Sequence, residues 1–190
     1  MRLSGQADVL PVTISERLIE GHNLKPGATL CALGQFRSYN KLEGGRSRLM
    51  LTVFVRELLS AAPTANPNSI VLSGYICKQP IYRTTPFNRE IADLLLAVNR
   101  AYNKSDYIPC IAWGRNARFV QNLKVGDRVA LSGRIQSREY VKKLSDTEQV
   151  IMTAYEVSVS KLAAFDEDEN FDLDGEFNLY AAPASAHSVQ

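Results

Sequence analysis

Residues 105–140 read SDYIPCIAWGRNARFVQNLKVGDRVALSGRIQSREY and hold the strongest fold signal in the chain. The segment Tyr107–Trp113 has the composition of a buried strand, Asn116–Asn122 that of a short helix, and Arg128–Tyr140 alternates between apolar and polar residues. Because successive side chains of a strand point to opposite faces, this alternation predicts one face toward a core and one toward solvent. In Arg128–Tyr140 the predicted inward residues are Val129, Leu131, Gly133 and Ile135, and the outward ones are Arg128, Arg134, Gln136, Arg138 and Tyr140. In Tyr107–Trp113, one face has Ile108, Cys110 and Ala112, and the other has Tyr107, Ile111 and Trp113. The stretch therefore predicts a strand, helix, strand unit.

The flanking segments extend this unit to five strands. Upstream, Ile70–Tyr82 and Glu90–Asn99 are predicted strands joined by a turn at Thr84–Arg89, and downstream Ile151–Ser160 is the last strand. The apolar run Ile91–Val98 has helical propensity, yet it also fits a strand that is buried on both faces, and we predict a strand. Five strands with a helix between the third and fourth are the order of an OB-fold barrel. The predicted fold class is mainly β.

The N-terminal part repeats much of this pattern. From Ala7 the chain reads ADVLPVTISERLIEGHNLKPGATLCALGQFRS, which aligns with the segment from Ser105 after one inserted residue, and Leu49–Leu58 aligns with Thr153–Leu162. The residues shared in register include Asp8 with Asp106, Pro11 with Pro109, Leu24 with Leu123, Gly34 with Gly133 and Ser38 with Ser137. This first copy supplies a strand, a helix and two strands, so it is an incomplete OB-like copy.

The predicted organisation has four parts: residues 1–59 form the incomplete copy, 60–69 a Pro-containing linker, 70–162 the complete OB-fold, and 163–190 an acidic flexible tail.

A barrel without its first two strands has open backbone edges, which proteins normally pair or cover. We expect the first copy to pack on the complete barrel as an intramolecular mimic of a dimer. Its open edge is then either closed by another chain in a homo-oligomer or explained by a start codon upstream of Met1. Val9 and Ser15 stand where the complete copy has Tyr107 and Trp113, so the first copy is predicted not to stack bases.

The charge distribution predicts a polyanionic partner. All 22 Lys and Arg residues but only 13 of the 20 acids lie in residues 1–165, which gives that part a net charge of +9. The three cysteines form no C-x-x-C pair, and no catalytic motif occurs, so neither an enzyme nor a metal site nor a cofactor is expected. No membrane segment or signal peptide is recognised, so a cytoplasmic protein associated with the nucleoid is expected.

The outward face of the complete copy combines aromatic rings with cations. Exposed rings stack on unpaired bases and cations bind phosphates, which is the requirement of single-strand recognition. The alternative is that Trp113 and Tyr107 belong to the core. The predicted DNA-binding residues are the aromatics Tyr102, Tyr107, Trp113 and Tyr140 and the cations Arg83, Arg89, Arg100, Arg115, Arg128, Arg134, Arg138 and Lys142.

Residues 69–162 resemble the bacterial single-stranded DNA-binding proteins, especially a divergent group from Gram-positive anaerobes. The resemblance rests on SGYICKQPIYRTTPFNREIADLLLAVNRAYNKSDYIPCIAWGRNA, VGDRVALSGRIQSREY and AYEVSVSKL. It implies stacking by the four aromatic residues, of which three are tyrosines where relatives often have tryptophan. It also implies an acidic tail that recruits replication and repair proteins, although the chain ends in His187, Ser188, Val189 and Gln190 rather than in the family's apolar tip.

The expected function is binding and protection of single-stranded DNA, without sequence preference, in replication, recombination and repair. Two alternatives remain open. Stacking and phosphate contact also suit an OB-type RNA-binding protein. A replisome scaffold that binds only protein through its barrel is the other.

Overall fold

A computed structural model describes residues 7–20, 24–60, 68–143, 145 and 148–165. The centre of the predicted linker, residues 61–67, and the acidic tail from residue 166 onward lie outside the described residues. Within the described part of the chain, no helix has the length and apolar character needed to cross a membrane.

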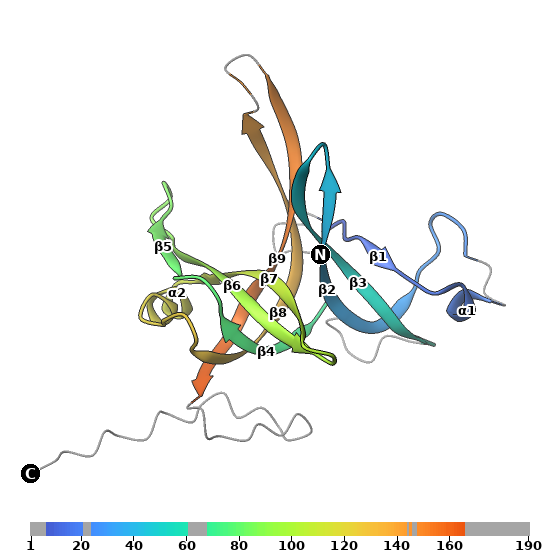
Figure 1. Cartoon of the computed structure of the whole chain (residues 1–190), viewed down its shortest axis with the longest axis horizontal. Coiled ribbons are helices and arrows are strands. Elements are labelled where there is room, and N and C mark those ends of the chain that lie inside the picture. Colours follow the sequence, from blue (N-terminus) through green and yellow to red (C-terminus); the bar gives the residue numbers. More distant parts are fainter. Residues whose placement is uncertain (1–6, 21–23, 61–67, 144, 146–147, 166–190) are drawn as a thin grey trace, which may run out of the picture.

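Residues 70–165 form a closed barrel with the order of an OB-fold (Figure 1). Neighbouring strands follow the order β4, β8, β9, β7, β6, and the pairing of Tyr75 with Ala97 joins β4 to β6 and closes the ring. The pairing of β7 with β9 is parallel and the other barrel pairings are antiparallel. The predicted fold class is confirmed. The elements are β4 (Ile70–Ile76), β5 (Ile81–Thr84), β6 (Glu90–Arg100), β7 (Lys104–Trp113), α2 (Arg115–Val120), β8 (Arg128–Lys143) and β9 (Gln149–Phe165).

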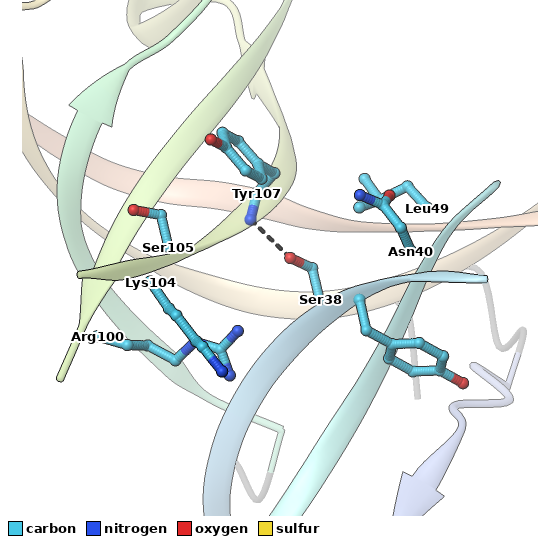
Figure 2. Close-up of a pocket in the computed structure, with 8 residues that line it drawn as sticks. Ser38, Asn40, Leu49, Arg100, Lys104, Ser105 and Tyr107 are labelled. Atoms are coloured by element: carbon cyan, nitrogen blue, oxygen red, sulfur yellow. Dashed lines mark hydrogen bonds between the residues drawn. The ribbon is translucent and has the colours of Figure 1, made fainter. Parts of the chain in front are cut away.

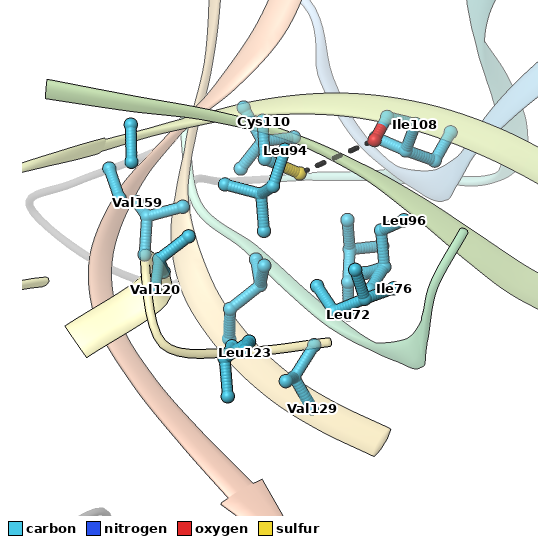
Figure 3. Packing of buried hydrophobic residues seen from close by; sticks show 14 of the residues in the cluster. Leu72, Ile76, Leu94, Leu96, Ile108, Cys110, Val120, Leu123, Val129 and Val159 are labelled. Carbon is cyan, nitrogen blue, oxygen red and sulfur yellow. Dashed lines mark hydrogen bonds between the residues drawn. The ribbon is translucent and has the colours of Figure 1, made fainter. Parts of the chain in front are cut away.

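Alternating side chains of these strands fill the barrel (Figure 3). Ile108, Cys110 and Ala112 of β7 are buried, as predicted from their shared parity. Val129, Leu131 and Ile135 of β8 are also buried, which confirms the predicted inward face of that strand. The helix α2 closes one end of the barrel with its buried residues Ala117 and Val120.

The segment between residues 70 and 100 forms three strands rather than the predicted two. Residues 91–98 form part of β6, so the predicted strand is confirmed despite the helical propensity of the run. The prediction of one strand over Ile70–Tyr82 was wrong, because the chain leaves β4 after Ile76 and re-enters a strand only at Ile81. Pro80 has no backbone N–H for a sheet and interrupts the pairing, and β5 then extends the edge of β6 as a hairpin.

The first copy forms a three-stranded sheet with the topology of half the barrel. Its strand order β1, β3, β2 corresponds to β7, β9, β8 of the barrel, with one parallel and one antiparallel pairing in each. The elements are β1 (Val12–Thr13), α1 (Glu16–Ile19), β2 (Cys31–Glu43) and β3 (Arg46–Leu59).

The two copies agree at the level of single residues. The parallel pairing begins at Val12 with Val53 in the first copy and at Cys110 with Val157 in the barrel, which are aligned positions. The bulges between Leu33 and Gly34 and between Ser132 and Gly133 are aligned as well. At both glycines a Cβ atom would collide with a backbone carbonyl of the neighbouring strand, 2.5 Å away at Gly34. The close approach explains why each bulge has glycine.

Reciprocal hydrogen bonds join the copies. The Asp106 carboxylate accepts a bond from the backbone N–H of Ser38 (2.6 Å), and the Ser38 hydroxyl accepts one from the N–H of Tyr107 (2.7 Å). At the aligned positions, Asp8 accepts a bond from the N–H of Ser137 (3.0 Å), and Ser137 Oγ accepts one from the N–H of Val9 (3.1 Å). Two equivalent contacts with exchanged partners are the signature of two-fold symmetry, so the copies pack as a pseudo-dimer within one chain.

Candidate nucleic-acid interface

The four predicted stacking residues all lie on the surface. Tyr107 and Trp113 lie on the outward side of β7 and are 44% and 39% exposed. Tyr102 is 94% exposed in the turn between β6 and β7, where its φ of 63° fits a tight hairpin. Tyr140 is 37% exposed near the C-terminal end of β8. Together with β9, β8 extends as a hairpin beyond the barrel (Figure 1). The alternative that Trp113 and Tyr107 belong to the core is therefore wrong.

Trp113 is held in position by a neighbouring strand. Its indole Nε1 donates a hydrogen bond to Ser158 Oγ of β9 (3.2 Å). Ser158 lies opposite Ile111 in the sheet, so the indole leans from β7 across the position of Ile111. Ile111 has the outward parity of its strand and is nevertheless buried, with 4% exposure. The ring is thus fixed at its edge while part of its surface stays open.

Tyr140 has a cation beside its ring. The guanidinium carbon of Arg138 lies 5.9 Å from the centroid of the Tyr140 ring, within the range of a cation–π contact. Arg138 Nε also lies 3.7 Å from Glu156 Oε1. This pair places a stacking surface and a positive charge together, two residues apart on one face of β8.

The predicted cations fall into two groups. Five are exposed. One of these, Arg83, forms an ion pair with Asp93 at 2.8 Å, and both side chains of the pair remain accessible to solvent. Three are half-buried. The exposed cations are Arg83, Arg89, Arg115, Arg138 and Lys142, and the half-buried ones are Arg100, Arg128 and Arg134.

Two of the half-buried arginines contact the junction between the copies. Arg134 Nη1 lies 2.7 Å from Asp8 Oδ2, and Arg100 Nε lies 3.1 Å from Asp106 Oδ2. The prediction that Gln136 belongs to the solvent face of β8 was wrong, because its side chain is buried and donates a hydrogen bond to Glu156 (2.7 Å). Asp8 of the first copy contacts this part of β8 at Arg134 and Ser137, which strand alternation alone does not reveal.

Phe87 was missed by the sequence interpretation. It is 86% exposed in the connection between β5 and β6, where Arg89 N–H bonds to Thr85 Oγ1. The sequence feature that could have identified Phe87 is the position of an aromatic residue within a polar Thr/Pro/Asn turn. At the base of this hairpin, Tyr82 donates a hydrogen bond to Glu90 (2.7 Å), and that bond raises the pKa of the Tyr82 phenol.

The described residues contain no group of three or more His, Cys, Asp or Glu side chains placed to hold a metal ion. Burial raises the pKa of the Cys110 thiol, so this side chain is a neutral part of the core. The surface has exposed aromatic rings, of which Trp113 is fixed at its edge by Ser158 and Tyr140 has Arg138 beside it, so its geometry suits stacking and charge contact.

The closed strand order, with a helix between β7 and β8, places this chain in the class of OB-fold proteins. The model of the Single-strand binding protein family matches residues 67–163, about half of the chain. The chain belongs to this family.

Three relatives place the chain among known proteins. Single-stranded DNA-binding protein 2 of Listeria monocytogenes is 35% identical over 115 residues, which are 57% of this chain and 69% of that protein. Single-stranded DNA-binding protein A of Bacillus subtilis is 39% identical over 80 residues, 38% of this chain and 46% of that protein, so the chain spans about half of this relative. A deletion mutant of the single-stranded DNA binding protein from Thermus aquaticus shares the fold, with a TM-score of 0.56, 19% identity, and coverage of 75% of this chain and 62% of that one.

Proposed function

We propose that this protein binds single-stranded DNA without sequence preference. The observation that carries the proposal is the set of exposed aromatic residues Tyr102, Tyr107, Trp113 and Tyr140 on an OB-fold barrel. Stacking needs only the flat face that every base has, and it contributes about 1–3 kcal/mol per base. A duplex hides these faces, so the surface favours single strands.

Phosphates are the second part of the interaction. The exposed arginines and Lys142 lie on the elements that carry the rings or next to them, and Arg138 stands directly beside Tyr140. Each phosphate that such a cation neutralises releases bound counterions, which changes the logarithmic salt dependence by about 0.7 on single strands. The cations therefore account for the salt dependence of binding, and stacking on the aromatic rings accounts for the preference for unpaired bases.

Membership of the family favours DNA over the two alternatives, an RNA-binding barrel and a protein scaffold. The test is competition for a fluorescent dT oligomer, followed by anisotropy, with unlabelled dT, rU and duplex DNA of equal length. We expect dT to displace the probe at the lowest concentration and duplex DNA at the highest. Preferential displacement by rU would support the RNA alternative, and a probe that does not bind at all would support the scaffold.

The wider role follows from the same proposal. A protein that covers single strands acts in replication, recombination and repair, and it works in the cytoplasm at the nucleoid. Its acidic segment from residue 166, which has seven acids and no Lys or Arg before residue 177, is proposed to recruit replication and repair proteins. Assembly into a homo-oligomer through the first copy is part of this proposal.

A further inference from the structure

An open pocket of about 260 Å³ lies at the junction of the two copies. One wall belongs to the hairpin of β2 and β3, and the other to the hairpin of β6 and β7. We call it the junction pocket and define it by five of its lining residues: Asn40 and Leu49 from the first copy, and Arg100, Lys104 and Tyr107 from the barrel.

The hydrogen bonds between the copies hold the two walls in place. Ser38 bonds to Tyr107 and Asp106 on the barrel, so its side chain faces β7. Asn40 lies two residues further along β2 and therefore points to the same side. Leu49 is paired with Asn40 on β3. Figure 2 shows Asn40 and Leu49 on one side of the pocket and Tyr107, Arg100 and Lys104 on the other.

This set of side chains fits one nucleotide. The ring of Tyr107 offers a stacking surface, and the half-exposed Leu49 offers an apolar contact for the same base. The Asn40 amide has both donors and an acceptor for a base edge. Lys104 is exposed and supplies a positive charge for a phosphate, next to the half-buried Arg100.

The opposite side of the pseudo-dimer differs at three of the positions that define the junction pocket. The repeat places Val9 where the junction pocket has Tyr107, Glu139 in place of Asn40, and Thr153 in place of Leu49. At these three positions that side has neither a stacking ring nor a neutral amide, and the Glu139 carboxylate repels phosphate. In an assembly of two identical copies both sides would have these three side chains, whereas in the described part of this chain one side has them.

We propose that the junction pocket binds one nucleotide of a single strand and that the first copy contributes Asn40 and Leu49 to it. The inference rests on the proposed function and deepens it. The first copy has lost its own stacking positions, yet it forms a wall around a stacking residue of the barrel. The strand then passes from the barrel onto the first copy on one side of the pseudo-dimer only.

The test compares Leu49→Ala with Leu33→Ala in the full chain, by titration of a labelled dT oligomer. Both leucines belong to the first copy and both have exposed side chains, but Leu33 does not line the pocket. We expect Leu49→Ala to weaken binding about three- to tenfold with an unchanged salt slope, because it removes apolar contact and no charge. Leu33→Ala should bind like the unmodified chain.

Asn40→Asp is a second variant of the junction pocket. Asn40 is exposed and the substitution keeps the size of the side chain, so we expect the protein to fold normally. The new negative charge should weaken binding more than Asn40→Ala does. Normal binding by all the variants at Leu49 and Asn40, together with weak binding by Tyr107→Ala, would overturn the junction pocket and leave the proposed function intact. Normal binding by Tyr107→Ala and Trp113→Ala as well would overturn the proposed function itself.

Discussion

Replacement of Asp106 by alanine should uncouple the two copies and destabilise the whole chain. The Asp106 side chain is only 4% exposed, accepts the N–H bond of Ser38 at 2.6 Å, and lies 3.1 Å from Arg100 and 3.7 Å from Arg37. A hydrogen bond to a charged group contributes about 1.5–3 kcal/mol, and loss of one partner of a buried ion pair costs about 3–5 kcal/mol. Because both arginines keep some contact with solvent, we expect a loss of about 2–4 kcal/mol in the free energy of unfolding.

The assay is urea unfolding, followed by the fluorescence of the single tryptophan and by far-UV circular dichroism. With a slope of about 2 kcal/mol per molar urea, the midpoint should fall by roughly 1–2 M. Asp93→Ala is the control, since Asp93 forms an exposed pair with Arg83 that is worth less than about 1 kcal/mol. If Asp106→Ala lowers the midpoint no more than Asp93→Ala does, the buried carboxylate does not hold the two copies together as a pseudo-dimer.

Four further outcomes are expected. Trp113→Ala should weaken dT binding by about 1–3 kcal/mol and leave the fold intact, because it removes a surface ring; a marked loss of thermal stability with unchanged affinity would contradict this. Gly133→Ala should lower the urea midpoint strongly, since its Cβ collides with the Ser158 carbonyl, and an unchanged midpoint would refute the close approach. Arg138→Ala should cost less affinity than Trp113→Ala and reduce the logarithmic salt slope by about 0.7, as measured by titration at several salt concentrations. Removal of residues 166–190 should leave circular dichroism unchanged and slightly strengthen DNA binding, because seven acids that compete with DNA are lost; weaker binding would argue against that competition.

Local pattern was sufficient for the barrel and for the repeat. Strand alternation in Arg128–Tyr140 identified the inward residues, and the buried strand over residues 91–98 was recognised although its composition also suits a helix. The alignment of the two copies showed that Gly34 and Gly133 are equivalent, but it did not show that each glycine lies at a bulge. These features depend on neighbours in sequence or on one strand pairing.

The alternation of apolar and polar residues along the strands could not predict the contacts between the two copies. Arg134 follows the outward parity of β8, yet it pairs with Asp8 of the first copy, and the bond from Ser137 to Asp8 joins residues 129 positions apart. Gln136 has the same parity, yet it is buried and bonds to Glu156. The shared Asp and Ser positions were visible in the alignment, but their exchange across a pseudo-two-fold axis requires the tertiary structure. The junction pocket has the same origin, since its two walls come from different copies.

Titration of the full chain with a dT oligomer, followed by the fluorescence of Trp113, measures directly whether this face binds single strands. The ring is 39% exposed on the proposed binding face and is the only tryptophan, so a stacked base should quench its emission. We expect saturable quenching by dT that weakens steeply with added salt, and little quenching by duplex DNA at the same concentrations. Equal quenching by duplex and single strand, or a response that does not depend on salt, would contradict the account.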